Sequence, residues 1–219
     1  MLTFEEIKND GEIRTYISAA DATLSAIGYT EHSFPHVTKV AHDAARILSA
    51  VGQSEHDVEL ARIAGFMHDI GNLVNRKDHS QSGAVMAFTI LSKRGMPPAD
   101  IAEIVTAIGN HDEGTGVPVS KIAAALILAD KSDVRRTRVR NSDGYQVDIH
   151  DRVNYSVESS ELVVDKVLGT ANLVLKIDTG ISALMDYFEI FLTRMTLCRH
   201  AAEKLGLTFK LTINDERFI

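Results

Sequence analysis

The chain has 219 residues with 23 Lys and Arg against 30 Asp and Glu, a formal net charge of −7 at pH 7, and 45% hydrophobic residues. This composition is typical of an ordinary soluble globular protein. The acidic balance disfavours nucleic acid as a partner, because cationic side chains supply most of the affinity for phosphates. No apolar run approaches the ~18 residues of a membrane helix, so no membrane partner is expected. The single cysteine, Cys198, excludes an intrachain disulfide framework, and with the polar, acidic start of the sequence it favours a cytoplasmic location.

Hydrophobic residues at helical spacing predict six helices in the first two thirds of the chain. The expected ranges are 11–28, 33–52, 54–71, 80–95, 97–111 and 118–136. Several of these ranges open at a residue suited to N-capping or close at a glycine, as Ser54 and Gly95 illustrate. The sixth range is apolar nearly all round between Ile122 and Ala129, which indicates a helix at the centre of the core.

The pattern changes after about residue 141. Two β-type runs within 161–178 surround the stretch GTAN and predict a hairpin, followed by a long helix over 180–206 and a last strand over 207–213. We therefore expect a mainly α fold, with a helical domain over 1–141 and a small C-terminal α+β appendage over 142–219 packed on it. An exposed sheet edge in the appendage would allow a homodimer.

Histidines and aspartates stand at or near the ends of the predicted helices. They are His36, His68, Asp69, His79, His111 and Asp130. Packed helices can bring several ends to one rim, and imidazole with carboxylate suits zinc, iron, manganese, cobalt or nickel. Asp130 closes the most apolar helix, so it would be buried and would need a metal or a cationic partner such as Lys131 or Arg135. The remaining histidines are interpreted as exposed or capping residues: His32, His42, His56, His150 and His200.

Five segments between Ser33 and Arg140 together resemble the HD superfamily of metal-dependent phosphohydrolases: HVTKVA, HDIG, HSQSGA, AIGNHDE and LADKSD. The resemblance implies an HD-type helical bundle. It also implies that the first metal is held by His36, His68, Asp69 and Asp130. In members with two metals, Asp69 would bridge the ions, and His79 and His111 would help to hold the second. The expected cofactor is thus one or two divalent transition-metal ions per chain.

The resemblance also implies a reaction, the hydrolysis of a phosphate ester or anhydride by a metal-bound water. The substrate expected is a nucleotide or a similar small phosphorylated molecule. Asp69 and Lys131 are the expected catalytic residues, and Arg76, Lys77 and Arg135 are candidates for binding the substrate phosphate. The basic run 131–140, which contains two of these cations, could also be a solvated helix end.

Departures from the family pattern narrow the range of expected substrates. Cyclic-dinucleotide phosphodiesterases of the family commonly carry Lys where this chain has Asn72, and paired histidines where it has Asn110 and His111. A cyclic di-GMP enzyme is therefore not expected. Two alternatives of other classes stay open: a di-iron oxygenase of the same superfamily, and a non-catalytic metal-binding regulatory module.

Overall fold

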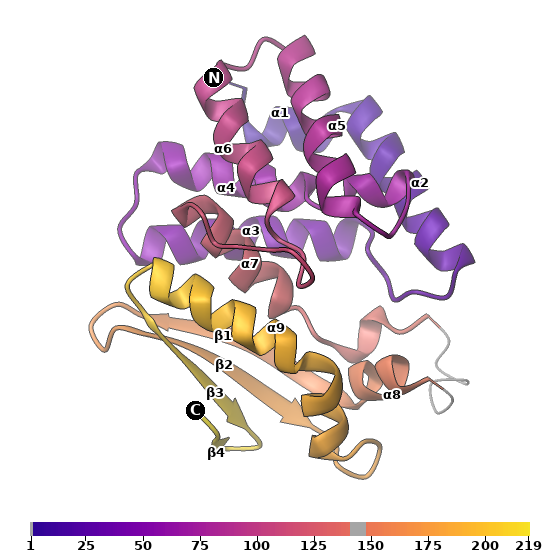
Figure 1. Ribbon diagram of the computed structural model, residues 1–219, viewed down its shortest axis with the longest axis vertical. Coiled ribbons are helices and arrows are strands. Elements are labelled where there is room, and N and C mark those ends of the chain that lie inside the picture. The colour runs from indigo at the N-terminus through magenta and orange to yellow at the C-terminus, as the bar shows by residue number, and fades with distance from the viewer. Residues whose placement is uncertain (1, 141–147) are drawn as a thin grey trace.

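Helices dominate the computed structural model, which describes residues 2–140 and 148–219 (Figure 1). The helical part contains α1 (Phe4–Asn9), α2 (Gly11–Ala26), α3 (Phe34–Ala50), α4 (Glu55–Met67), α5 (His79–Lys93), α6 (Pro98–Gly109) and α7 (Lys121–Lys131), with short 3-10 turns η1 (Ile70–Leu73) and η2 (Arg136–Arg138). The C-terminal part contains α8 (Ile149–Ser156), α9 (Leu184–Lys204) and a four-stranded sheet. The mainly α fold with a small α+β appendage is confirmed.

The predicted helices are all somewhat shorter than expected, and the third and the sixth differ most from their expected ranges. The third ends at Met67 rather than at residue 71, and the chain continues as η1. Gly71 lies within η1 and lets this turn pack directly against α5, because a Cβ there would lie 2.0 Å from the backbone oxygen of His79 and 2.4 Å from the nitrogen of Gly83. The sixth begins at Lys121 rather than at residue 118, because the Ser120 side chain caps it by accepting from the amide of Ala123, and it ends at Lys131 rather than at residue 136.

Two short helices were not anticipated. α1 is held by a capping box between Thr3 and Glu6, and α8 is capped by Asp148, whose side chain accepts from the amides of His150 and Asp151. Each is too short for a periodic hydrophobic pattern to stand out, since a helical stripe needs several turns to be recognised. Tertiary packing rather than intrinsic propensity stabilises helices of this length.

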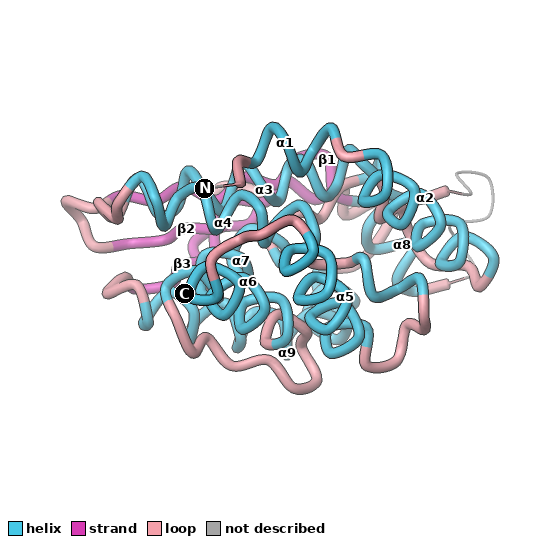
Figure 2. Tube along the Cα trace, turned by 90° about the horizontal axis from the view of Figure 1, so that it is seen from above, coloured by secondary structure: helices cyan, strands magenta, loops and turns pink. Residues whose placement is uncertain are grey.

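The core of the helical part lies where α3, α4 and α7 pack together. Every residue of α7 from Ile122 to Asp130 is buried, which confirms its predicted central position. α4 approaches α3 closely at Gly65, where a Cβ would lie only 2.7 Å from the Cα of Ala41. The view from above shows α3, α4 and α7 grouped in the middle, with α2 and α5 further out (Figure 2).

The sheet has the order β1 (Val157–Asp165), β2 (Thr170–Ile177), β3 (Thr208–Ile213), β4 (Glu216–Arg217). β1 and β2 form the predicted antiparallel hairpin, in which Leu162 pairs with Leu173. β2 and β3 are parallel, so the chain crosses over between them through α9. α9 lies between the sheet and α7, and this position brings its side chains close to the end of α7 (Figure 1).

Buried hydrophobic side chains run without interruption from the helical part into the appendage. The predicted boundary between residues 141 and 142 falls outside the described residues, so the division into two domains stays a prediction. Across residues 2–140 and 148–219, no helix is both long and apolar enough to cross a membrane.

Candidate metal centre

Asp69 stands between two pairs of histidines, one facing each of its carboxylate oxygens. Its Oδ2 lies 3.5 Å from Nε2 of His36 and 3.2 Å from Nε2 of His68. Its Oδ1 lies 3.5 Å from Nε2 of His79 and 3.9 Å from Nε2 of His111. The chain reaches this arrangement because α4 stops at Met67, which places Asp69 in the turn before η1 rather than on a helix face.

The first pair of histidines is completed by Asp130, from the last turn of α7. Its Oδ1 lies 3.4 Å from Nε2 of His36 and 3.6 Å from Nε2 of His68. Donors about 2.0–2.2 Å from a common ion lie about 2.8–3.6 Å apart in tetrahedral or octahedral geometry. The spacing of these donors is therefore suitable for one ion, and His36, His68 and Asp130 form a buried cluster that could hold a metal.

The second pair is equally close, because Nε2 of His79 lies 3.2 Å from Nε2 of His111. His68, Asp69 and His111 form a second buried cluster of suitable spacing. Asp112, which sequence reasoning missed, places its Oδ1 3.9 Å from Nε2 of His79. All six residues expected from the sequence thus converge on one place.

Each of the four histidines turns its Nε2 toward this centre, because its Nδ1 is held from outside. In His36, Nδ1 lies 2.8 Å from Oδ2 of Asp133. In the other three histidines, Nδ1 faces a backbone oxygen. Those distances are 2.8 Å for His68 to Gly65, 3.0 Å for His79 to Arg76 and 2.6 Å for His111 to Ile108. A proton on Nδ1 leaves the lone pair of Nε2 free, which is the usual tautomer of a metal ligand.

Two of these nitrogens carry a further signature. Nε2 of His36 and Nε2 of His68 are fully buried and have no hydrogen-bond partner of acceptable geometry within the described part of the chain. A buried polar atom without a partner is costly. A cation bound between these nitrogens and the carboxylates of Asp69 and Asp130 would remove that cost, so the residues present fit a divalent metal.

The electrostatics of the cluster also favour a cation. Burial alone would lower the pKa of His68, but Asp69 and Asp130 outweigh it and raise that pKa to about 10. Burial opposes ionisation of Asp69 and Asp130 too, yet cationic neighbours, including His68, hold the pKa of each carboxyl well below its usual range. The carboxylates are therefore stabilised by nearby positive charge. A metal ion would supply that charge in place of the proton on His68.

Behind Asp130 a chain of buried and partly buried ion pairs leads to α9. Nζ of Lys131 lies 2.6 Å from Oδ2 of Asp130 and 3.2 Å from Oε2 of Glu113. The other oxygen of Glu113 accepts from Nε of Arg194 at 2.9 Å. The pairing of Asp130 with Lys131 weighed from the sequence is thus present, but it occupies Oδ2 and leaves Oδ1 facing the histidines.

The three phosphate-binding candidates are placed very differently. Arg76 donates from Nη1 to Oδ1 of Asn72 at 3.4 Å and lies 3.3 Å from Nε2 of His79, beside the centre. Lys77 is exposed. Arg135 is bound through Nε to Oδ1 of Asp133 at 2.8 Å. Of the three, only Arg76 is among the described residues that line the adjoining cleft.

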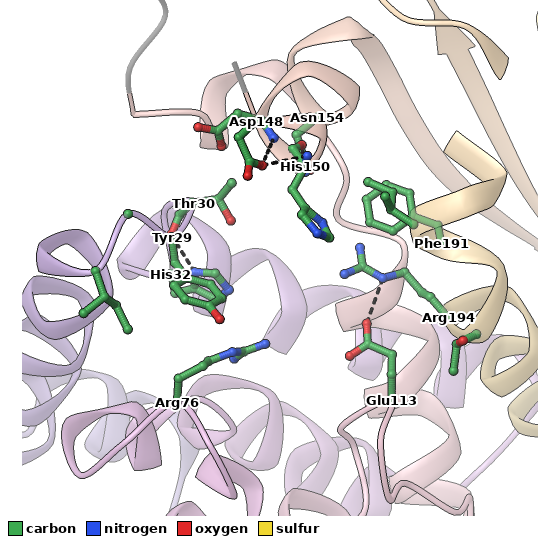
Figure 3. A pocket seen from close by; sticks show the side chains of 15 residues that line it. Tyr29, Thr30, His32, Arg76, Glu113, Asp148, His150, Asn154, Phe191 and Arg194 are labelled. Carbon is green, nitrogen blue, oxygen red and sulfur yellow. Dashed lines mark hydrogen bonds and ion pairs between the residues drawn. The ribbon is translucent and has the colours of Figure 1, made fainter. Parts of the chain in front are cut away.

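That cleft has a volume of about 500 Å³. Its walls come from the segment after α2, from Arg76, from Glu113 and from the appendage (Figure 3). Two arginines of the basic run 131–140 hold the segment after α2 in place. Arg138 donates to the backbone oxygen of Glu31 and Arg140 to that of Tyr29, each at 2.9 Å. Sequence reasoning missed most of the cleft's lining: Tyr29, His32, Asp148, His150, Asn154, Phe191 and Arg194.

A buried centre of histidines and aspartates at helix ends defines a helical protein with a candidate metal site. The model of the HD domain family matches residues 34–146, just over half of the 219 residues, and the chain belongs to this family. The matched range contains all six converging residues.

Two individual proteins are also similar to this chain. The chain is 23% identical to the uncharacterized protein MJ1020 of Methanocaldococcus jannaschii over 162 residues, which is 64% of this chain and 62% of that protein. The chain thus spans less than two thirds of the length of this curated relative. A crystal structure of a predicted HD superfamily hydrolase from an uncultured Thermotogales bacterium is 26% identical, with a TM-score of 0.45, covering 57% of this chain and 67% of that one.

Proposed function

We propose that the protein is a metal-dependent phosphohydrolase that cleaves a phosphate ester or anhydride bond in a small phosphorylated molecule such as a nucleotide. The observation that carries this proposal is the position of Asp69, whose two oxygens face two separate pairs of histidine Nε2 atoms. Membership of the HD domain family and the cleft of about 500 Å³ beside this centre support it. Clefts of that size commonly hold small ligands.

Under this proposal the first ion would be held by His36, His68, Asp69 and Asp130, and the second by Asp69, His79 and His111. When bound, a divalent ion lowers the pKa of a coordinated water and stabilises negative charge on a phosphoryl oxygen. The donor set does not identify the metal, because imidazole with carboxylate suits iron, manganese, nickel, cobalt or zinc.

The protein's own side chains would orient the reactants. Asn72 donates from Nδ2 to Oδ1 of Asp69 at 2.9 Å and so restricts rotation of that carboxylate. Arg76, next to His79 and on the cleft wall, would contact a phosphoryl oxygen with its fork of donors. Lys131 is 4% exposed and bound to Asp130 and Glu113, so we assign it a positioning role behind Asp130.

The test begins with protein purified without added metal or chelator, and its metal content is measured by elemental analysis. Phosphate release from a panel of nucleotides and phosphate esters is then assayed in parallel with oxygen uptake. We expect phosphate release that falls roughly a hundredfold or more in Asp69→Asn. The matched control is Asp215→Asn, since Asp215 is exposed and has a φ of 69°, which Asn also tolerates.

Three outcomes would contradict the proposal. Oxygen uptake without phosphate release would indicate the di-iron oxygenase instead. Metal binding without either activity would favour a regulatory module. Equal phosphate release by Asp69→Asn and the wild type would remove Asp69 from the reaction.

A further inference from the structure

The appendage supplies one wall of the cleft, and that wall carries an arginine. Arg194 projects from α9 into the cleft, while Arg76 projects into it from the opposite side (Figure 3). Only Nε of Arg194 has a hydrogen-bond partner, Glu113, among the residues that the structure describes. Its two terminal nitrogens therefore remain available to a ligand.

The guanidinium of Arg194 is held in place before any ligand binds. It lies over the ring of Phe191, 4.2 Å from the ring centre, and its ion pair with Glu113 fixes the side chain from the other side. Its side chain is 22% exposed, so it is partly withdrawn from water. A preorganised, partly dehydrated guanidinium binds phosphate more strongly than a mobile surface cation does.

Arg76 has a related but separate environment. Its guanidinium lies 5.4 Å from the ring centre of Tyr29 and contacts His79, so it belongs to the metal side of the cleft. Arg194 comes from α9 and is linked to the centre through the ion pairs of Glu113 and Lys131, so it belongs to the appendage side. Two guanidinium groups on opposite walls, in different environments, can bind two anionic groups of one ligand.

The remaining charged residues of the cleft leave Arg76 and Arg194 as the groups that would attract an anion. Glu113 is neutralised by Lys131 and Arg194. Asp148 and Asp151 are the other carboxylates of the lining, and both lie at the start of α8, where Asp148 caps the helix. In Figure 3 Asp148 lies beside His150 and Asn154, across the cleft from Arg76. An anionic ligand would therefore place its charge toward the two arginines.

We propose that Arg194 binds a second anionic group of the substrate, beyond the phosphoryl group that is cleaved, and that the substrate class is a polyphosphorylated small molecule such as a nucleoside polyphosphate. This inference rests on the proposed phosphohydrolase function for its substrate, but its test uses binding alone. The appendage then acts as the part of the protein that selects polyphosphates over monophosphates.

The test compares inorganic phosphate with pyrophosphate by isothermal titration calorimetry. The protein carries its purified metal, and magnesium in the buffer occupies the chelating oxygens of pyrophosphate. We expect the wild type to bind pyrophosphate about tenfold more tightly than phosphate, and Arg194→Gln to lose that preference with little change in its affinity for phosphate. Arg199→Gln is the matched control, because Arg199 lies on the same helix and is exposed.

Two further measurements separate binding from structural effects. Arg194→Lys keeps a charge that can pair with Glu113, so it should stay folded and keep only part of the preference. Metal content and thermal melting are recorded for every variant. Equal binding of the two anions by the wild type, no binding of pyrophosphate, or equal weakening of both anions in the Arg194 variants would each overturn the proposal.

The two proposals fail in different ways. Preference for pyrophosphate through Arg194 without phosphate release from any ester would leave this inference standing and remove the phosphohydrolase function. Phosphate release from simple esters without that preference would do the reverse.

Discussion

Asn72 holds the carboxylate of Asp69 by a hydrogen bond to Oδ1, the oxygen that also faces His79 and His111. Its Nδ2 donates both to Oδ1 and to the backbone oxygen of Asp69, each at 2.9 Å. Both residues belong to the turn that follows α4, so the same local geometry that follows the helix end also fixes the carboxylate of Asp69. The residue that departs from the pattern of the cyclic-dinucleotide enzymes therefore has a defined structural task here.

Replacing Asn72 by Ala should weaken metal binding by about 10–100-fold, because a partner that orients a ligand carboxylate contributes that much in comparable sites. Titration against a competing chelator would measure the change. Asn9→Ala is the control, since Asn9 is exposed and bonds only within α1. Unchanged metal affinity in Asn72→Ala would mean that Asp69 needs no such support.

Metal stoichiometry should distinguish the two halves of the centre. We expect wild-type protein to hold two ions and His111→Ala to hold one, because His36, His68, Asp69 and Asp130 remain intact in that variant. Elemental analysis per folded chain provides the number. His200→Ala, an exposed substitution on α9, should keep both ions. A single ion in the wild type would contradict the dinuclear assignment.

Asp133 should affect the binding affinity of the first metal ion only. It orients His36 through the 2.8 Å contact with Nδ1, and it touches none of the ligands of the second site. Asp133→Asn should therefore weaken one of two binding steps by about tenfold or more and leave the other unchanged. Calorimetric metal titration would resolve the two steps. Arg135→Gln, which keeps the bond to His36 but removes an ion pair of Asp133, should have the smaller effect.

Gly71→Ala should destabilise the protein by about 2–4 kcal/mol, because the new methyl group would overlap backbone atoms of His79 and Gly83 that cannot move separately. Denaturant unfolding measures this change in the free energy of unfolding. Gly11→Ala is the matched control: it lies in the first turn of α2 with no atom within 4 Å of the added Cβ, so it should be neutral or stabilising. Equal stability of both variants would refute the close contact at Gly71.

Local chemistry in the sequence was sufficient to single out the residues of the candidate metal centre. His36, His68, Asp69, His79, His111 and Asp130 all stand next to helix ends that caps, glycines and apolar periodicity mark, and all six converge in the structure. Such residues could be predicted because helix ends are determined within a few residues of chain. The hairpin and the long helix α9 were accessible for the same reason.

The residues that line the cleft are brought together by tertiary packing alone. Glu113 and Arg194 are 81 positions apart, and Asp133 reaches His36 across 97 positions, so no local pattern connects either pair. The choice among Arg76, Lys77 and Arg135 also depended on packing, because a cation's type does not tell whether it is exposed, paired or aimed at a site. The sequence by itself determined which residues can bind a metal. Only the fold, by bringing α8 and α9 over the ends of the helical part, decided what can lie beside it.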